Sequence, residues 1–105
     1  MEVKEQGFSG QGLRTLFEEK TDAVGVQFST VTILPGERVP KEGLSKHEEN
    51  EYSIIIKGKM EGESGGKPFQ VSKSNATFIP AGEEHWTINS GEEPCEIVCV
   101  LVKEK

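Results

Sequence analysis

The sequence predicts an all-β protein built as an antiparallel sandwich or barrel. Turn signals recur at short intervals along the 105 residues, with strand-like pieces between them. Twelve glycines and five prolines disfavour long helices in so short a chain. About eight short strands without a helical pattern are typical of this architecture.

The first half of the chain holds two predicted strands and a long loop. Residues 13–19 form the first strand. Residues 24–28 alternate between apolar and polar, and residues 31–34 continue the alternation with its parity shifted by one residue, which predicts a bulge near Ser29 or Thr30. Pro35 then ends the strand and opens a polar loop that runs to about Asn50.

The second half begins with the longest predicted strand, residues 51–63. Its central run Ile54-Ile55-Ile56 predicts burial on both faces, and Gly58 predicts a bulge or a close backbone approach. A glycine-rich hairpin turn follows. The remaining predicted strands cover residues 69–71, 76–79, 85–89 and 95–102, and residues 103–105 form a solvated tail.

Composition limits the classes of function. Eighteen acidic and 12 basic side chains give a net charge of −6, which argues against a general binder of nucleic-acid phosphates. No apolar stretch approaches the roughly 20 residues of a membrane span, and the N-terminus lacks the apolar core of a signal peptide. We therefore expect one cytoplasmic domain over residues 1–105, with no nucleic-acid or membrane partner.

The two cysteines, Cys95 and Cys99, fall within one predicted strand. Four residues of extended chain separate their Cα atoms by roughly 13 Å, whereas a disulfide needs less than about 7 Å. Both side chains point to the same face, so we interpret them as small core residues rather than as a redox or metal site.

The two histidines lie in short stretches that each precede an apolar run, residues 47–51 and 80–89. Imidazole and carboxylate groups are the donors that divalent zinc, iron, nickel and manganese accept. In a regular strand His47 and Glu51 would be roughly 13 Å apart, so residues 48–50 must bend if the two share an ion. The turn at Pro80 would present His85 at the start of the next strand.

Alternation gives His85 two neighbours on its own face, Thr87 and Asn89, and places Trp86 on the other face. A metal-binding imidazole usually donates its second ring N–H to a polar neighbour. Asn89 and Thr77 are candidates for that acceptor. Trp86 is more typical of a core residue than of a substrate platform.

The spacing His47-x3-Glu51-x6-Gly58 resembles the later part of the first cupin motif, G-x5-H-x-H-x3/4-E-x6-G. Pro80-x-Gly82-x2-His85-x3-Asn89 is similar to the body of the second, G-x5-P-x-G-x2-H-x3-N. The resemblance covers residues 34–102. It implies a double-stranded β-helix (jelly-roll) cupin barrel over about residues 24–102. It also implies a divalent ion, Fe, Mn, Ni or Zn, held by His47, Glu51 and His85.

The chain departs from these motifs at two positions. Ser45 stands where the first His of H-x-H belongs, and Ser74 replaces the leading Gly of the second motif. The loop that leads to His47 is also longer than usual, and in the shorter register Glu42 takes the first-ligand place. Three outcomes are open: Glu42 as a fourth ligand, water in its place, or weak or no metal binding. We favour three protein ligands and water.

Two classes of function are consistent with this pattern. The first is a metal-dependent enzyme of the dioxygenase, isomerase or lyase type, acting on a small organic molecule. The sequence identifies no general base. The candidates are named only because they lie near the predicted ligands, and they are Glu42, Ser45, Glu49 and Tyr52. The second is a module that binds or senses a small ligand or a metal without turnover. A homodimer is also expected, because the edge strand at residues 13–19 needs covering.

Overall fold

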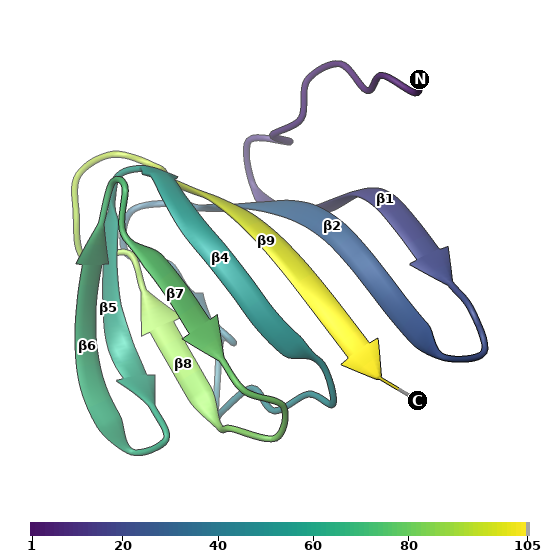
Figure 1. Cartoon of the computed structure of the whole chain (residues 1–105). Helices are drawn as coiled ribbons and strands as arrows, with labels where there is room; N and C mark the ends of the chain where they lie inside the picture. Colours follow the sequence, from purple (N-terminus) through teal and green to yellow (C-terminus); the bar gives the residue numbers. More distant parts are fainter. Residues whose placement is uncertain (105) are drawn as a thin grey trace.

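A computed structural model describes residues 1–104 and shows two antiparallel β-sheets packed face to face (Figure 1). Over this range the chain forms nine strands and no helix, which confirms the all-β prediction. Accordingly, no helix in residues 1–104 is long and apolar enough to cross a membrane.

The larger sheet is the platform of the fold. Its five strands run in the order β1 (Gly12–Lys20), β2 (Val24–Ile33), β9 (Cys95–Glu104), β4 (Asn50–Lys57) and β7 (Ala76–Ile79). β2 and β9 pair along their whole length. Lys103 and Glu104, which we expected in a tail, belong to β9 because they pair with Gly25 and Val24. Lys105 lies outside the described residues.

β2 pairs with β9 without a register shift, so the prediction of a bulge near Ser29 or Thr30 is wrong. The larger sheet is irregular instead in β4, between Ile55 and Lys57, and in β1. Leu16 is the extra residue in β1. Its neighbours Thr15 and Phe17 pair with Ser29 and Phe28, which are adjacent in β2. Both faces of β2 are covered here. Ser29 and Thr30 point to opposite faces and both are buried, and the Thr30 hydroxyl donates to the carbonyl of Gly7. The alternation of apolar residues therefore shifts by one position because side chains on both faces of β2 are buried here.

The smaller sheet faces the platform. Its four strands run in the order β3 (Arg38–Val39), β8 (His85–Ile88), β5 (Lys59–Ser64) and β6 (Lys67–Ser72). β3 is a two-residue strand inside the region expected to be a loop. β8 pairs with both β3 and β5, which fixes the position of the second histidine.

The predicted strand at residues 51–63 is divided between the two sheets at Gly58. This residue has a φ of 81° and separates β4 in the larger sheet from β5 in the smaller one. A Cβ atom at this position would lie 2.7 Å from the carbonyl oxygen of Pro94, so the crossing requires glycine. The predicted close backbone approach is confirmed, and the single long strand is wrong.

The core lies between the sheets at the end away from the histidines. Its buried members come from β2, β4 and β9, with half-buried side chains from both sheets packed against them. They are Ile33, Ile55, Cys95 and Ile97, packed against Val31, Met60 and Val71. Cys95 and Cys99 are both free and buried, which confirms their interpretation as core residues.

The outer face of the larger sheet is less covered than the sequence predicts. Ile55 is 1% exposed, whereas Ile54 is 40% exposed and Ile56 is 41% exposed. The isoleucine run is therefore buried on one face only, and the prediction of burial on both faces is wrong for the single chain. β9 shows the same pattern, with buried and half-buried residues alternating from Cys95 to Val100.

Candidate metal centre

The two histidine segments are joined by backbone hydrogen bonds. The amide of Gly82 donates to the carbonyl of His47 at 2.8 Å, and the amide of Ala81 donates to the side-chain oxygen of Asn50 at 2.8 Å. Ser45 and His85 form an antiparallel bridge, with N–H to O distances of 2.8 and 3.0 Å. The loop before β4 and the turn before β8 therefore hold each other in place.

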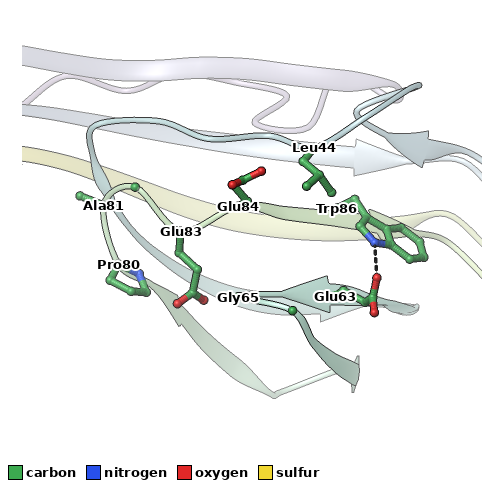
Figure 2. Close-up of a pocket in the computed structure, with 10 residues that line it drawn as sticks. Leu44, Glu63, Gly65, Pro80, Ala81, Glu83, Glu84 and Trp86 are labelled. Carbon is green, nitrogen blue, oxygen red and sulfur yellow. Dashed lines mark hydrogen bonds between the residues drawn. The ribbon is translucent and has the colours of Figure 1, made fainter.

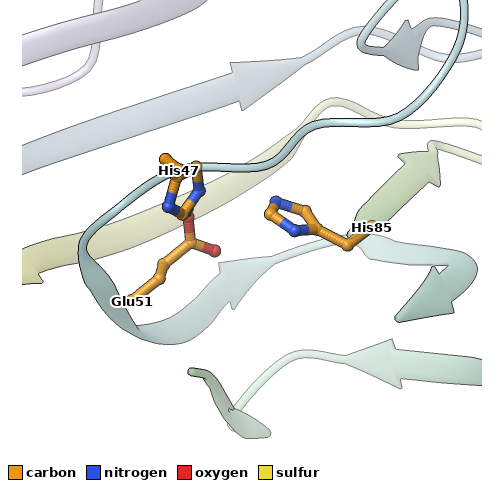
Figure 3. A group of neighbouring side chains, drawn as sticks. All are labelled: His47, Glu51 and His85. Atoms are coloured by element: carbon orange, nitrogen blue, oxygen red, sulfur yellow. Dashed lines mark ion pairs between the residues drawn. The ribbon is translucent and has the colours of Figure 1, made fainter. Parts of the chain in front are cut away.

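The structure brings the three predicted ligands together (Figure 3). One potential ligand atom from each of His47, Glu51 and His85 lies within 4.8 Å of the other two. His47 Nε2 is 3.4 Å from Glu51 Oε1, which the bend at residues 48–49 makes possible. The two imidazole rings meet edge to face, with centroids 5.1 Å apart and an interplanar angle of 76°.

Each imidazole is oriented by a backbone carbonyl two residues away. His47 Nδ1 lies 3.3 Å from the carbonyl oxygen of Glu49, and His85 Nδ1 lies 3.0 Å from that of Glu83. A carbonyl oxygen only accepts hydrogen bonds, so Nδ1 carries the proton in both rings. In a neutral ring, Nε2 then keeps its lone pair and can bind a metal.

These carbonyls replace the acceptors expected from the sequence. Asn89 is 1% exposed and its amide donates to the carbonyls of Ile33 and Glu93, so it closes the turn after β8 and does not support His85. Thr77, the other acceptor expected from the sequence, pairs with Ser53 in the larger sheet. The orienting groups are backbone atoms, which carry no residue signature in a sequence.

The other candidate ligands and bases lie either away from the triad or on the same face as His85. Glu42 is exposed and is not part of the three-residue group found among residues 1–104. Tyr52 is 48% exposed and follows Glu51 along β4, so alternation turns it to the outer face, away from the triad. Ser45 is different, because directly paired residues of an antiparallel bridge present their side chains on the same face. It lies on the face of His85.

Beyond the triad, the inner face of the larger sheet carries a row of small polar side chains: Ser29, Cys99 and Ser53. Cys99 pairs with Ser29 on one side and with Ser53 on the other. This inner polar row lies two residues along β4 from Glu51, which is roughly 7 Å in an extended strand. The amide of Gln27 donates to the Ser29 hydroxyl at 3.2 Å.

Both cysteines are held as neutral thiols. Burial raises the pKa of Cys99 to about 11, and the charge of Glu51 adds to the rise while the hydrogen bond with Ser53 reduces it. Burial also raises the pKa of Cys95 to about 11, with further contributions from Glu93 and Glu96. Metal-binding cysteines are thiolates, so the neutral thiols are consistent with a core role.

A separate hollow lies on the other side of β8, beside Trp86 (Figure 2). It has a volume of about 630 Å³, and its carboxylates are Glu63, Glu83 and Glu84. The indole N–H of Trp86 donates to Glu63 at 3.0 Å, and the guanidinium of Arg38 lies 4.6 Å from the ring centroid. The alternation of β8 correctly placed Trp86 opposite His85, but no pattern in the sequence indicated this hollow.

Comparison with known proteins identifies the family. The sequence profile of the cupin domain matches residues 29–101. Mannose-1-phosphate guanylyltransferase from Escherichia coli is 32% identical over 68 residues, which is 65% of this chain. The matched region spans only 14% of the length of that protein.

Two solved structures of similar size share the fold. An RmlC-like cupin from Methanocaldococcus jannaschii, with a double-stranded β-helix fold, has a TM-score of 0.75 at 18% identity, covering 99% of this chain and 92% of that one. A predicted oxalate decarboxylase from Thermotoga maritima has a TM-score of 0.69 at 21% identity, covering 98% and 99%. Together with the matched profile, these likenesses confirm the jelly-roll barrel, and the chain belongs to the cupin family.

Proposed function

We propose that His47, Glu51 and His85 bind one divalent transition-metal ion, and that the protein uses this centre to act on a small organic molecule. The observation that carries the proposal is the convergence of the three donors within 4.8 Å, with both Nδ1 atoms facing backbone carbonyls. Two imidazoles and one carboxylate form a donor set that accepts Fe, Mn, Ni or Zn.

The separation of the His47 and Glu51 donors fits an ion of this kind. Protein nitrogen and oxygen donors lie about 2.0–2.2 Å from zinc, so two donors to one ion are roughly 3–4 Å apart. The 3.4 Å between His47 Nε2 and Glu51 Oε1 falls in this interval. The His47 and Glu51 side chains are 27% and 21% exposed, so an ion and a small molecule can reach them from solvent.

When bound, such an ion would supply Lewis-acid polarisation or, as Fe(II), oxygen activation. The residues of this chain would hold the ion and leave room for the substrate. The carbonyls of Glu49 and Glu83 hold the two imidazoles in one tautomer and one orientation. The triad supplies three donors, which leaves open positions for water and substrate.

The inner polar row supports a small polar molecule as the ligand. Ser53 and Cys99 lie on the same inner face as Glu51, roughly 7 Å further along the strands. Cys99 is buried, but the half-buried Ser53 can bond through its hydroxyl to an oxygen atom of a short acid or alcohol. Small carboxylates are the first class to test, since one structural relative is described as a predicted oxalate decarboxylase.

One observation favours a second candidate, a module that binds a metal or a small molecule without turnover. Ser45 lies on the face of His85 at the position where the cupin motif has its first histidine. A centre with three protein donors and a serine holds metal less firmly than one with four donors. It can serve as a sensor of ligand or metal concentration.

Reconstitution of the metal-free protein separates these candidates. The protein would be loaded in turn with Fe(II), Mn, Ni and Zn, and its metal content measured beside that of a His85→Ala variant. It would then be incubated with a panel of short mono- and dicarboxylic, hydroxy and keto acids. One metal per chain with product formation supports the enzyme, and one metal per chain without product supports the binding module. No metal above the level of His85→Ala contradicts the metal centre and the enzyme, and leaves only a module that binds a small molecule without metal.

A further inference from the structure

The turn before β8 is attached to the smaller sheet as well as to the loop before β4. The hydroxyl of Ser64 donates to Glu83 Oε2 at 2.6 Å, and the amide of Gly65 donates to the carbonyl of Glu84 at 2.9 Å. Ser64 is the last residue of β5, and Gly65 begins the turn into β6. The tip of the β5–β6 hairpin therefore contacts the segment that orients His85.

Glu83 takes part in three different contacts of this segment. Its amide donates to the carbonyl of Pro80 at 3.1 Å, which closes a tight turn in which Gly82 has a φ of 82°. Its carbonyl oxygen lies 3.0 Å from His85 Nδ1, and its carboxylate accepts the hydrogen bond from Ser64. One residue thus joins the turn, the hairpin and the imidazole.

The carboxylate of Glu83 is closely packed against the hairpin. A Cβ atom on Gly65 would lie 3.0 Å from Glu83 Cδ and 3.1 Å from Oε1, so the carboxylate rests on bare backbone (Figure 2). Glu83 and Ser64 are both half-buried. A hydroxyl bonded to a carboxylate at about 2.5–2.7 Å makes a stronger hydrogen bond than two neutral groups do. The bond therefore fixes the Glu83 side chain, and with it the Cα atom that carries the orienting carbonyl.

Glu84 provides a contrast within the same turn. It carries the same charge, but its side chain is exposed, makes no hydrogen bond or ion pair within residues 1–104 and points the other way in Figure 2. Substitution of Glu84 removes a negative charge near His85 and leaves the Ser64–Glu83 bond in place. It is therefore the matched control for Glu83.

We propose that Glu83 is a positioning residue held by Ser64, a role that rests on the metal centre proposed above and extends it to the β5–β6 hairpin. The Ser64–Glu83 bond keeps the Glu83 carbonyl at His85 Nδ1, so the neutral ring keeps the lone pair of Nε2 for an ion. Without the bond the carbonyl shifts. The ring can then carry its proton on Nε2, which removes that lone pair.

Nuclear magnetic resonance of the metal-free protein tests this role without any ion. Long-range proton–nitrogen spectra of isotope-labelled protein report the tautomer of His85, and they would be recorded at about pH 8.5, where an ordinary imidazole is neutral. The wild type should carry the His85 proton on Nδ1. Ser64→Ala and Glu83→Ala should show a mixture of the two tautomers, whereas Glu83→Gln, which keeps an acceptor oxygen for Ser64, and Glu84→Ala should resemble the wild type.

Zinc affinity provides the second measurement, by competition with a chelator. Ser64→Ala and Glu83→Ala should each raise the dissociation constant about tenfold, the lower end for groups that orient a metal ligand. Glu83→Gln and Glu84→Ala should leave it unchanged, because the effect comes from a hydrogen bond and not from the charge. Circular dichroism and the melting transition would show that all variants are folded.

The two measurements separate failure of this role from failure of the metal centre. A wild type that binds no zinc would contradict the centre, and the spectra of the metal-free protein would still decide whether Ser64 and Glu83 orient His85. A single, unchanged tautomer in Ser64→Ala and Glu83→Ala would overturn the positioning role. So would zinc binding that these two substitutions leave unchanged, or that Glu83→Gln weakens as much as Glu83→Ala does.

Discussion

The backbone of Ser45 pairs with that of His85 in both directions: the Ser45 amide donates to the His85 carbonyl at 2.8 Å, and the His85 amide donates back at 3.0 Å. Residues paired in this way present their side chains on one face. Ser45 is therefore the position from which a further ligand would reach the candidate metal centre. In the cupin motif this position is a histidine.

Ser45→His should strengthen metal binding. A third imidazole would enter on the face of His85, and we expect the dissociation constant for Zn or Ni to fall about tenfold or more, equal to about 1.4 kcal/mol. Isothermal titration with a competing chelator measures this change. Glu42→Gln is the control and should leave the constant unchanged, since Glu42 is exposed and outside the triad. A loss of affinity in Glu42→Gln would instead make Glu42 a ligand.

Stability should fall in alkaline solution because of the buried thiols. The pKa of Cys95 and of Cys99 rises from 9.0 to about 11 on burial, so between these values the folded chain keeps protons that the unfolded chain loses. The contribution is complete below about pH 9 and is lost as the pH rises toward 11. The loss is roughly 1.4 kcal/mol per pH unit for each thiol.

Urea denaturation of the metal-free protein between pH 8 and 11 measures this dependence. Other groups titrate in the same range, so the informative quantity is the difference between the wild type and a Cys95→Ala/Cys99→Ala variant. The variant should start less stable, because it loses buried atoms, and its stability should fall less steeply with pH. Equal slopes in the two proteins would refute the role of the thiols.

Ser74→Gly should stabilise the protein. Ser74 has a φ of 76°, in the left-handed region that costs a residue with a Cβ atom about 1–2 kcal/mol. Glycine removes this cost but gains freedom in the unfolded chain, so we expect a net gain of roughly 0.5–1 kcal/mol in the free energy of unfolding. Ser72→Gly, at the end of β6, is the comparison and should lose a similar amount. A destabilised Ser74→Gly would contradict this reading of the turn.

Gly62→Ala should disturb the strand that carries His85. A Cβ atom on Gly62 would lie 2.0 Å from the carbonyl oxygen of Trp86 and 2.8 Å from the Cα of Thr87, both backbone atoms that move only with β8. We expect a loss of about 3 kcal/mol in unfolding free energy, the upper end for overpacking, together with weaker metal binding. Gly25→Ala is the matched strand control, since its nearest contact is the Lys20 side chain at 3.9 Å. It should be close to neutral.

Much of the fold and the centre of the site follow from local sequence. The turn residues delimit most strands, and the spacing around His47, Glu51 and His85 matches a known pair of motifs. The structure adds the reason for their convergence, which is the set of hydrogen bonds from the turn before β8 to the loop before β4.

The remaining features depend on contacts between distant segments. The division at Gly58 arises because the chain meets the Pro94 carbonyl there. The Asn89 side chain lies in the turn after β8, where its amide donates to the carbonyl of Ile33, a residue far away in the sequence. Ile54 and Ile56 read as buried residues, yet they are 40% and 41% exposed because the smaller sheet covers only the other face of β4. None of these partners is visible in a local pattern.

Anomalous diffraction from crystals of the metal-loaded protein tests the central claim most directly. Data collected on either side of the absorption edge of the added metal should give one strong peak per chain, about 2.0–2.2 Å from a nitrogen of His47, a nitrogen of His85 and an oxygen of Glu51. The same crystals of His85→Ala should lack it. A fully loaded crystal with its peak elsewhere, or with none between these three side chains, would contradict the proposed metal centre.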